Sequence, residues 1–377
     1  MTQAAGSPRP QPFTVALAAG GTGGHLFPAQ ALAETLIGRG YAVHLFTDQR
    51  GMEYAGRFPA EALHHVPSAT MSFGKPLEIL SQALKLFAGY RRARALLKQI
   101  APRVAVGFGG YPSLPPLIAA QHLGIPTALH EQNAVMGRAN RIVARGANAI
   151  ATSFSHLHNA APALQKKVVL TGNPVRASVI AASDRPYRPP QANEPFNLLV
   201  FGGSQGARFF SEFVPDLLEQ LPAAVRRTLT LVQQCRPEDM EAVKARTEAL
   251  GVKALLAPFF ADLPDRIASA HLVVARSGAS TIAELGVIGR PAILVPLPHA
   301  LESDQLRNAE SFAAEGAGWV RPQASLKAPE LAAFLTQLRY ADRELAAAAA
   351  AAKRQGRPNA AERLADLVVS LGGPVDG

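Results

Sequence analysis

The same local pattern occurs twice in this chain, about half its length apart. An apolar run at 13–19 enters the turn Gly-Gly-Thr-Gly-Gly-His at 20–25, and a second run at 196–201 enters Gly-Gly-Ser-Gln-Gly at 202–206. An apolar strand that turns directly into a helix is typical of parallel α/β sheets. Glycine turns at that point leave backbone N–H groups bare at a helix N-terminus, where they hold phosphate. The pattern predicts a phosphate-binding turn in each half of the chain, and two such turns facing each other would form a cleft for a diphosphate.

The length of the chain and its alternating pattern predict two α/β domains. A chain of 377 residues exceeds the size at which one hydrophobic core usually stops growing. Apolar runs alternate with helix-like segments in both halves, which predicts two Rossmann-like, doubly wound parallel sheets facing across a cleft. The strand-like runs are 13–19, 42–47, 104–108, 127–129, 149–151 and 168–170 in the first half, and 198–201, 228–233, 253–257, 272–275 and 292–296 in the second.

Shifts in composition mark the expected domain boundaries. The first dozen residues are small, polar and rich in proline, and a second proline-rich polar stretch begins at Ser183. Helices are expected at 28–39, where Pro28 stands near the start, and at about 360–371. The expected parts are a flexible tail (1–12), a first domain (13–182), a linker (183–195), a second domain (196–358) and a C-terminal segment (359–377) whose helix packs on the first domain.

Composition narrows the class of protein. Hydrophobic residues make up 48% of the chain and charged residues 18%, which is typical of a globular protein. The single cysteine, Cys235, excludes an internal disulfide framework and suits a reducing cytoplasm. Because no signal-peptide-like or membrane-spanning apolar stretch is found, we expect a protein that is neither exported nor membrane-spanning.

Half of the formal net charge of +10 falls in one stretch, 77–103, which holds six basic residues and one acidic residue. Apolar residues are interleaved there with basic ones, and no acidic residue occurs between Glu78 and Glu131. One interpretation is an amphipathic helix that docks on an anionic membrane surface. The other is an ordinary domain helix with a core face and a solvated basic face. No nucleic-acid-binding signature accompanies the charge, so we do not expect a nucleic-acid partner. The basic residues are Lys85, Arg91, Arg92, Arg94, Lys98 and Arg103.

His25 is the candidate catalytic residue of the first glycine turn. A histidine at a helix N-terminus has a lowered pKa and is neutral and basic, so it could take a proton from a substrate hydroxyl. The alternative is a histidine that only bonds nearby backbone. The turn is not a dinucleotide fingerprint, because Leu26 stands where a glycine would be needed, nor a P-loop. Asp48, at the end of the second strand, nevertheless keeps a nicotinamide-dependent oxidoreductase open as an alternative.

Polar side chains also follow other predicted strands. They occur at 108–113, at 130–141 and at 276–284, where a turn with Gly278 leads into a helix. Glu284 in that helix could accept hydrogen bonds from a ribose diol, or could merely complement the helix dipole. Gln305 and Asn308 could share a helix face and read sugar hydroxyls. No Cys/His cluster and no D-x-D run is present, so we expect no metal site and no cofactor.

Taken together, these motifs resemble the MurG family of bacterial N-acetylglucosaminyltransferases, in the right order over nearly the whole chain. The motifs that carry the resemblance are Gly-Gly-Thr-Gly-Gly-His at 20–25, Gly-Gly-Tyr-Pro-Ser at 109–113, His-Glu-Gln-Asn-Ala-Val at 130–135, Thr-Gly-Asn-Pro-Val-Arg at 171–176, Gly-Gly-Ser-Gln-Gly-Ala-Arg at 202–208, Arg-Ser-Gly-Ala-Ser-Thr at 276–281 and Gln-Leu-Arg-Asn-Ala at 305–309. The resemblance implies the two-domain GT-B fold. It also implies transfer of N-acetylglucosamine from UDP-N-acetylglucosamine to the C4 hydroxyl of undecaprenyl-pyrophosphoryl-N-acetylmuramoyl-pentapeptide (lipid I), with inversion, to form lipid II.

The resemblance also assigns site residues, with His25 as candidate base. The implied contacts to UDP-N-acetylglucosamine are Thr22, Gly23, Gly24, Asn133, Arg176, Ser204 at the diphosphate, Phe260 beside the uracil, Ala279, Ser280, Thr281, Ile282, Ala283, Glu284 on the ribose, and Gln305 on the sugar hydroxyls. The chain departs from the family pattern just before Gln305, where Glu302 stands in place of an expected aspartate, so neither Glu302 nor Asp304 is assigned a role.

Localisation and biological role follow from the same resemblance. It implies a peripheral enzyme on the cytoplasmic face of the bacterial cell inner membrane, bound through the stretch 77–103. It also implies a part in peptidoglycan synthesis and cell wall biogenesis, and through them in cell shape, cell division and the cell cycle. The alternatives are the nicotinamide-dependent oxidoreductase and a non-enzymatic, basic membrane-binding protein.

Overall fold

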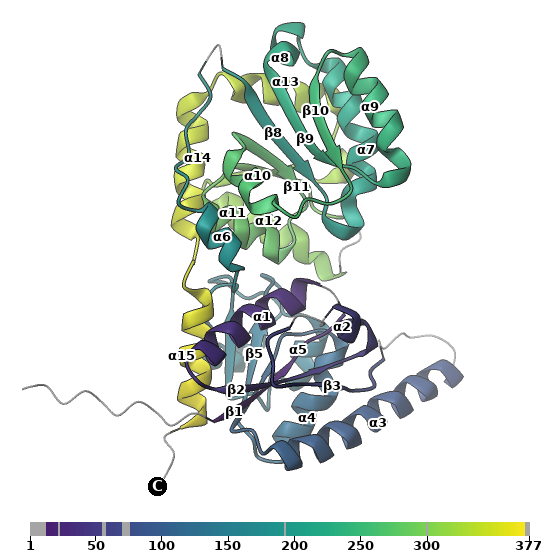
Figure 1. The fold of residues 1–377 in the computed structure, drawn as a ribbon, viewed down its shortest axis with the longest axis vertical. Helices are drawn as coiled ribbons and strands as arrows, with labels where there is room; N and C mark the ends of the chain where they lie inside the picture. Colours follow the sequence, from purple (N-terminus) through teal and green to yellow (C-terminus); the bar gives the residue numbers. More distant parts are fainter. Residues whose placement is uncertain are drawn as a thin grey trace, which may run out of the picture. The chain divides into compact units, whose positions relative to one another are not determined.

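The computed structural model of the chain describes residues 13–21, 23–54, 58–69, 76–191, 194–298 and 301–373. They form two compact units, each built around a parallel sheet (Figure 1). The first unit takes in the chain up to Gln132, Met136–Pro174 and the chain from Asn359 on, whereas the second takes in Asn133–Val135 and Val175–Pro358. The two parallel α/β units confirm the fold class predicted from the alternating pattern.

The sheet of the first unit has, within the described residues, seven strands in the order β3-β2-β1-β4-β5-β6-β7. The strands are β1 (Thr14–Ala18), β2 (Ala42–Thr47), β3 (Ala62–His65), β4 (Val104–Gly107), β5 (Thr127–Glu131), β6 (Ala149–Thr152) and β7 (Val168–Leu170). The helices of this unit are α1 (Gly23–Gly38), α2 (Gln49–Tyr54), α3 (Pro76–Ile100), α4 (Leu114–His122), α5 (Arg138–Val143) and α15 (Ala360–Gly372).

Both faces of the first sheet are covered, which is why its strands read as continuous apolar runs. On one face, Val15 and Leu17 of β1 pack in a core cluster with residues of α1 and α15. On the other, Ala16 and Ala18 pack in a cluster with residues of α3, α4 and α5 (Figure 1). Leu364, Ala365 and Val368 bring α15 into the first cluster. Because full burial of a Leu or Val side chain contributes about 1.5–3 kcal/mol, α15 is an integral part of this unit.

The sheet of the second unit has, within the described part of the chain, six strands in the order β10-β9-β8-β11-β12-β13. The strands are β8 (Phe196–Phe201), β9 (Leu229–Gln234), β10 (Lys253–Ala257), β11 (Leu272–Ala275), β12 (Ala292–Leu294) and β13 (Gly318–Val320). The helices of this unit are α6 (Ala177–Ala182), α7 (Gly203–Gln220), α8 (Ala223–Thr228), α9 (Met240–Ala249), α10 (Leu263–Ser269), α11 (Ala279–Ile288), α12 (Asp304–Ala314), α13 (Ala328–Arg339) and α14 (Asp342–Gln355).

Packing in the second unit follows the same plan. Phe196, Leu198 and Val200 of β8 form a core cluster with residues of α7, α8 and α13. Helix α6 packs against α10 and α11 of this unit. The long continuous part of the second unit, Val175–Pro358, therefore starts before the proline-rich stretch at Ser183.

The observed elements differ from the sequence prediction in two respects. Strands β3 and β13 were not predicted, because both are short strands at the edge of a sheet and neither is a clear apolar run. Helix α1 begins at Gly23 and not at Pro28, and α7 begins at Gly203. Residues of the predicted glycine turns therefore form the first turns of these helices, where backbone N–H groups have no intrahelical partner.

The order of strands locates the expected ligand-binding edge of each sheet. The order reverses between β1 and β4 in the first sheet and between β8 and β11 in the second. Open α/β sheets bind ligands outside the carboxyl ends of the strands at such a reversal. The segments that follow these four strands begin at Ala19, Phe108, Gly202 and Arg276, and all four belong to motifs singled out in the sequence.

Candidate active site

His25 lies in the first turn of α1, directly after β1. Gly23 and Gly24 share this turn, and Thr22 lies outside the described residues. The Nδ1 atom of His25 is 3.2 Å from Oε1 of Gln132, which follows β5. His25, predicted from the turn after the first strand, is thus held by Gln132, which is more than a hundred positions later in the chain.

The segment after β4 packs against the ring of His25 through bare backbone. Gly109 and Gly110 both have positive φ values, +84° and +73°. A Cβ atom on Gly110 would lie 3.3 Å from Cδ2 of His25, which is tighter than an ordinary contact. Glycine is needed here both for the backbone conformation and for the close approach of the imidazole ring.

Burial lowers the pKa of His25, and hydrogen bonds to Gln132 and to the Phe108 carbonyl oppose the shift only in part. The ring is therefore neutral at pH 7 and retains a lone pair that can accept a proton. The sequence predicted a lowered pKa from the helix N-terminus, whereas the structure shows that burial is the largest cause.

A second histidine, His130, is fully buried behind this site. Its Nε2 is 3.0 Å from the carbonyl oxygen of Gly172, and its Nδ1 is 3.0 Å from Nε2 of Gln132. Burial lowers the pKa of His130 from its ordinary value of 6.5 to about 4. His130 is therefore a neutral structural group at physiological pH.

We expect this neutral histidine to make stability fall in mild acid. Below pH 6.5 the unfolded chain protonates the residue while the folded protein does not, so the free energy of unfolding decreases by up to about 3 kcal/mol as the pH falls from 6.5 to 4. Urea unfolding across this pH range measures the slope. The slope should flatten in His130→Gln and remain in His156→Gln, which changes an exposed histidine. An unchanged slope in His130→Gln would contradict the assignment.

The segment after β5 is held in place by a buried carboxylate. Glu131 Oε2 accepts hydrogen bonds from the backbone N–H of Gly137, at 2.9 Å, and from Nδ2 of Asn140, at 2.8 Å. The sequence indicated that 130–141 is a partly buried segment facing a ligand. The structure shows that Glu131 and Asn140 bond within the segment and fix its conformation.

In the second unit, Glu284 lies in the second turn of α11 and is buried. Its Oε1 is 3.2 Å from Nη2 of Arg176, which immediately precedes α6. Burial raises the pKa of Glu284, and the charge of Arg176 opposes that shift. Two residues predicted to bind the donor thus meet, and Ala279–Ala283 occupy the turns of α11 before Glu284.

A hydrogen-bond network joins four segments of this unit. Ser277 Oγ donates to the backbone oxygen of Gln305, at 2.7 Å, and Gln305 Oε1 accepts from the N–H of Leu297, at 3.0 Å. Asn308 donates through Nδ2 to Oδ1 of Asn133, at 2.9 Å, and to the Ser277 oxygen, at 3.1 Å. Oδ1 of Asn308 accepts a hydrogen bond from the backbone N–H of Ala134, at 2.8 Å.

The interpretation of Asn308 as a reader of sugar hydroxyls is wrong. Its side chain is 0% exposed, and both ends of its amide are occupied by protein groups. Asn308 instead holds Asn133 against the turn after β11. Asn133, a predicted donor contact, is the residue that Asn308 supports, whereas Gln305 is held by Ser277 and Leu297.

Arg276 is a structural residue of this site whose role sequence reasoning missed. Its guanidinium is buried and donates to the carbonyl oxygens of Val295 and Pro296, at 3.0 and 3.2 Å, and to Oε1 of Gln323, at 2.6 Å. Burial lowers its pKa to about 10, so it remains charged at neutral pH. Arg276 therefore anchors the segment that runs from β12 toward Gln305. An arginine at the end of an apolar strand was the available signal.

The second glycine turn forms the start of α7. Gly203 has a φ of +66°, and the N–H of Gly202 donates to Oε1 of Gln234, at 3.2 Å. The side chain of Ser204 lies outside the described part. Phe260, the predicted neighbour of the uracil, is buried, and the Arg266 guanidinium lies 4.5 Å from the centre of its ring.

Asp48, the residue that left a nicotinamide-dependent oxidoreductase open as an alternative, has a local structural role. Its Oδ1 accepts a hydrogen bond from the N–H of Gly51 in the first turn of α2, at 2.9 Å. The carboxylate therefore caps that helix. The predicted site residues otherwise divide between the units, with His25 and its glycines in the first and Asn133, Arg176, Phe260, Glu284 and Gln305 in the second.

Comparison with known proteins places this arrangement in a family. Residues 15–152 match the glycosyltransferase family 28 N-terminal domain, and residues 197–364 match the C-terminal domain of the same family. The protein from Allorhizobium ampelinum named UDP-N-acetylglucosamine–N-acetylmuramyl-(pentapeptide) pyrophosphoryl-undecaprenol N-acetylglucosamine transferase is 52% identical over 95% of both chains. A protein of the same name from Agrobacterium fabrum is 52% identical over 95% of this chain and 94% of its own.

Solved structures agree with these relatives. The crystal structure of MurG from Acinetobacter baumannii superimposes with a TM-score of 0.78, at 29% identity, over 95% of this chain and all of that one. The match runs through both α/β units, as the GT-B fold class requires. The chain belongs to glycosyltransferase family 28.

Proposed function

We propose that this protein transfers N-acetylglucosamine from UDP-N-acetylglucosamine to the C4 hydroxyl of lipid I, with inversion, and so produces lipid II. The observation that carries the proposal is the arrangement at the carboxyl ends of the central strands. A neutral, partly buried histidine follows β1, and the buried Glu284 of α11 pairs with the half-buried Arg176. The names of the proteins from Allorhizobium and Agrobacterium state this donor, this acceptor and transfer of N-acetylglucosamine, and so support the transfer itself.

The proposed reaction is a single displacement. The oxygen of the acceptor hydroxyl forms a bond to the anomeric carbon, and the bond between that carbon and the UDP oxygen breaks with its electron pair leaving on UDP. Nε2 of His25 takes the hydroxyl proton. Backbone N–H groups in the first turn of α7 stabilise the charge of the leaving diphosphate, because they are oriented before the reaction begins.

Donor recognition is proposed to use residues of both units. Glu284 would accept hydrogen bonds from the ribose hydroxyls, and Gln305 would bind the sugar hydroxyls, since their positions are held by Arg176 and Ser277 respectively. The complete set of proposed contacts is Thr22, Gly23, Gly24, Asn133, Arg176, Ser204, Phe260, Ala279, Ser280, Thr281, Ile282, Ala283, Glu284 and Gln305.

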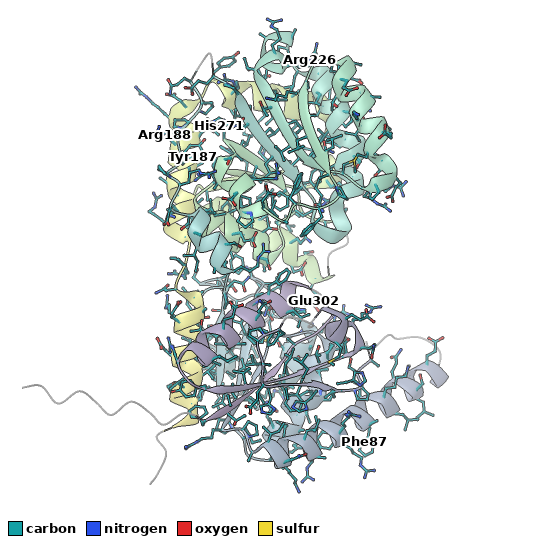
Figure 2. The ribbon with its side chains drawn as sticks, viewed as in Figure 1. Phe87, Tyr187, Arg188, Arg226, His271 and Glu302 are labelled. Atoms are coloured by element: carbon teal, nitrogen blue, oxygen red, sulfur yellow. The ribbon has the colours of Figure 1, made fainter. Side chains whose placement is uncertain are left out.

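Helix α3 is the proposed membrane contact, and its two halves differ in burial. Its second half packs into the core through Ala93 and Leu97. Its first half leaves Leu80, Leu84 and Phe87 exposed by 58%, 61% and 59% (Figure 2 labels Phe87). Spacings of four and three residues put these side chains on one side of the helix. Within the described residues, no helix has both the length and the apolar character needed to cross a bilayer.

Arg91 and Arg92 are exposed on the same helix, so we expect their removal to weaken membrane binding. Each basic residue near an anionic surface contributes about 1 kcal/mol, so Arg91→Gln/Arg92→Gln should lower binding to phosphatidylglycerol vesicles about tenfold or more. Sedimentation with phosphatidylglycerol and phosphatidylcholine vesicles measures the effect. The matched control is Arg227→Gln/Lys253→Gln, which removes the same charge from exposed sites of the second unit. Equal loss in both variants would show only a net-charge effect and would exclude α3 as the docking site.

The cellular role follows from the proposed acceptor. A peripheral enzyme on the cytoplasmic face of the bacterial inner membrane would meet both the soluble nucleotide sugar and the lipid-linked acceptor. Its product would feed peptidoglycan synthesis and, through it, cell shape and division.

The direct test is transfer of labelled N-acetylglucosamine from UDP-N-acetylglucosamine to a short-chain analogue of lipid I. We expect a labelled product with a β-1,4 link. A thermal-shift panel of UDP, UDP-N-acetylglucosamine and NAD separates the alternatives. Stabilisation by NAD alone would favour an oxidoreductase, and no response to any of the three would favour a non-enzymatic membrane binder.

A further inference from the structure

The amide of Gln132 lies between the rings of His25 and His130 and is 3% exposed. Its Oε1 is 3.2 Å from Nδ1 of His25. Its Nε2 is 2.9 Å from the carbonyl oxygen of Phe108, 3.1 Å from that of His130 and 3.0 Å from Nδ1 of the same residue. One buried amide is thus shared between the candidate base and the fully buried histidine behind it.

The orientation of this amide is determined by its neighbours. The two backbone carbonyl oxygens can only accept hydrogen bonds, so the NH₂ group of Gln132 must face them. Rotating the amide by half a turn would place Oε1 against both carbonyl oxygens of Phe108 and His130, with no donor between them. Such buried, unpaired acceptors cost about 1–3 kcal/mol each, so the observed orientation is strongly preferred.

His130 reinforces this orientation. Its Nε2 must donate to the carbonyl oxygen of Gly172, because that oxygen has no proton to give. The ring is neutral at physiological pH, so its Nδ1 has no proton and accepts from Nε2 of Gln132. The direction of each hydrogen bond is therefore set in turn, from Gly172 through His130 to Gln132.

The same reasoning extends to His25. Oε1 of Gln132 can only accept, so the atom that faces it, Nδ1 of His25, must carry the proton. A neutral imidazole has one ring proton, which leaves the lone pair on Nε2. We infer that Gln132 is a positioning residue that holds His25 in the Nδ1–H tautomer, so that Nε2 is the nitrogen available to the acceptor hydroxyl. This inference deepens the proposed function and rests on it for the role of His25 as base.

The tautomer is measurable without any activity assay. In protein labelled with ¹⁵N at histidine, long-range ¹H–¹⁵N correlation spectra near pH 7.5 distinguish a protonated from an unprotonated ring nitrogen. Loss of one set of signals in His25→Ala assigns the residue. We expect Nδ1–H for His25 and Nε2–H for His130 in the wild-type protein. An Nε2–H tautomer of His25 would overturn the inference, and this measurement needs no variant at Gln132.

Two substitutions then test the role of the amide itself. Gln132→Leu removes the acceptor, so the proton of His25 should distribute between both nitrogens. Gln132→Glu keeps an oxygen acceptor opposite Nδ1. At this buried position the carboxyl is expected to be protonated on its other oxygen, because the carbonyl oxygens of Phe108 and His130 that face it can only accept, so the Nδ1–H tautomer should persist. Gln30→Leu, which changes a glutamine on the same helix as His25 that bonds only to Glu34 in the described structure, is the matched control. An unchanged tautomer in Gln132→Leu would overturn the inference.

Kinetics complete the test. We expect Gln132→Leu to lower kcat at least about tenfold while the KM for UDP-N-acetylglucosamine changes little, because only the orientation of the base is lost. Gln132→Glu should retain more of the activity than Gln132→Leu. A rise in KM with unchanged kcat would show that Gln132 serves donor binding and would overturn the inference. Absence of transfer in the wild-type protein, with His25 in the Nδ1–H form, would instead refute the proposed function.

Discussion

Replacement of His25 by alanine is expected to lower kcat about 100- to 10,000-fold, the range that general base catalysis contributes. The imidazole is neutral at pH 7 because burial lowers its pKa. Its removal leaves no group at this position to take the proton of the attacking hydroxyl. Donor binding should change little, since the buried carboxylate and its arginine partner lie in the second unit.

Initial rates with saturating lipid I analogue, and calorimetric titration with UDP, separate these two effects. His156→Ala, a change at an exposed histidine of the same unit, is the control for loss of an imidazole and should retain wild-type kcat. Wild-type turnover in His25→Ala would remove His25 from the chemistry. A loss of UDP affinity as large as the loss of kcat would make it a binding residue.

Replacement of Glu284 by alanine is expected to weaken UDP binding about 10- to 100-fold. A hydrogen bond to a charged group contributes about 1.5–3 kcal/mol, and the proposed ribose contact would be lost together with the acceptor of Arg176. Glu284→Gln keeps the shape and one acceptor oxygen but removes the charge, so its loss should be intermediate. Calorimetric titration with UDP measures the affinity of both variants. Titration with uracil, which lacks the ribose, shows whether the loss is confined to the ribose contact.

The matched control for this prediction is Glu330→Ala. Glu330 pairs with Lys327 on the surface, where an ion pair contributes at most about 1 kcal/mol. UDP affinity should be unchanged in that variant. If Glu284→Ala bound UDP as tightly as the wild type, Glu284 would serve only to complement the dipole of α11, the alternative considered from the sequence.

The interior of both sheets was predictable because it depends on local pattern. Strands that are buried on two faces are continuous apolar runs. The observed strands β1, β2 and β8 therefore lie where the sequence indicated. The edge strands β3 and β13 were not predictable in the same way. Edge position alone is not the reason, since β7 and β10 are edge strands too and were predicted from their apolar residues. Ala62–His65 and Gly318–Val320 are not clear apolar runs, so their local pattern does not identify them as strands.

The site was predictable to the extent that it is built from turns. A glycine turn after an apolar strand identifies His25, and a turn with Gly278 identifies the start of α11. Asn308 shows where this reasoning stops. As a polar residue three positions after Gln305 it resembled a second ligand contact, yet it bonds Asn133, which is 175 positions away. A contact between residues so far apart in the chain cannot be predicted from the spacing of neighbouring residues.

Helix α3 illustrates the same limit in one element. Its periodicity and charge were evident in the sequence, but they fit a core helix and a membrane helix equally well. The tertiary structure shows which residues belong to the core, since Ala93 and Leu97 pack in the cluster beneath the sheet whereas Leu84 and Phe87 are exposed. The membrane contact of the exposed residues stays a prediction.

By itself, the sequence determined the two α/β halves, the glycine turns and the identity of the candidate base, because each of these depends on residues close together in the chain. Tertiary structure alone decided how the polar groups are used. It placed Asp48 at a helix start, Asn308 in a buried network and Gln132 between two histidines. The physical reason is that a hydrogen bond has a direction: whether a side chain donates or accepts, and so which nitrogen of His25 is free, follows only from the groups that surround it in space.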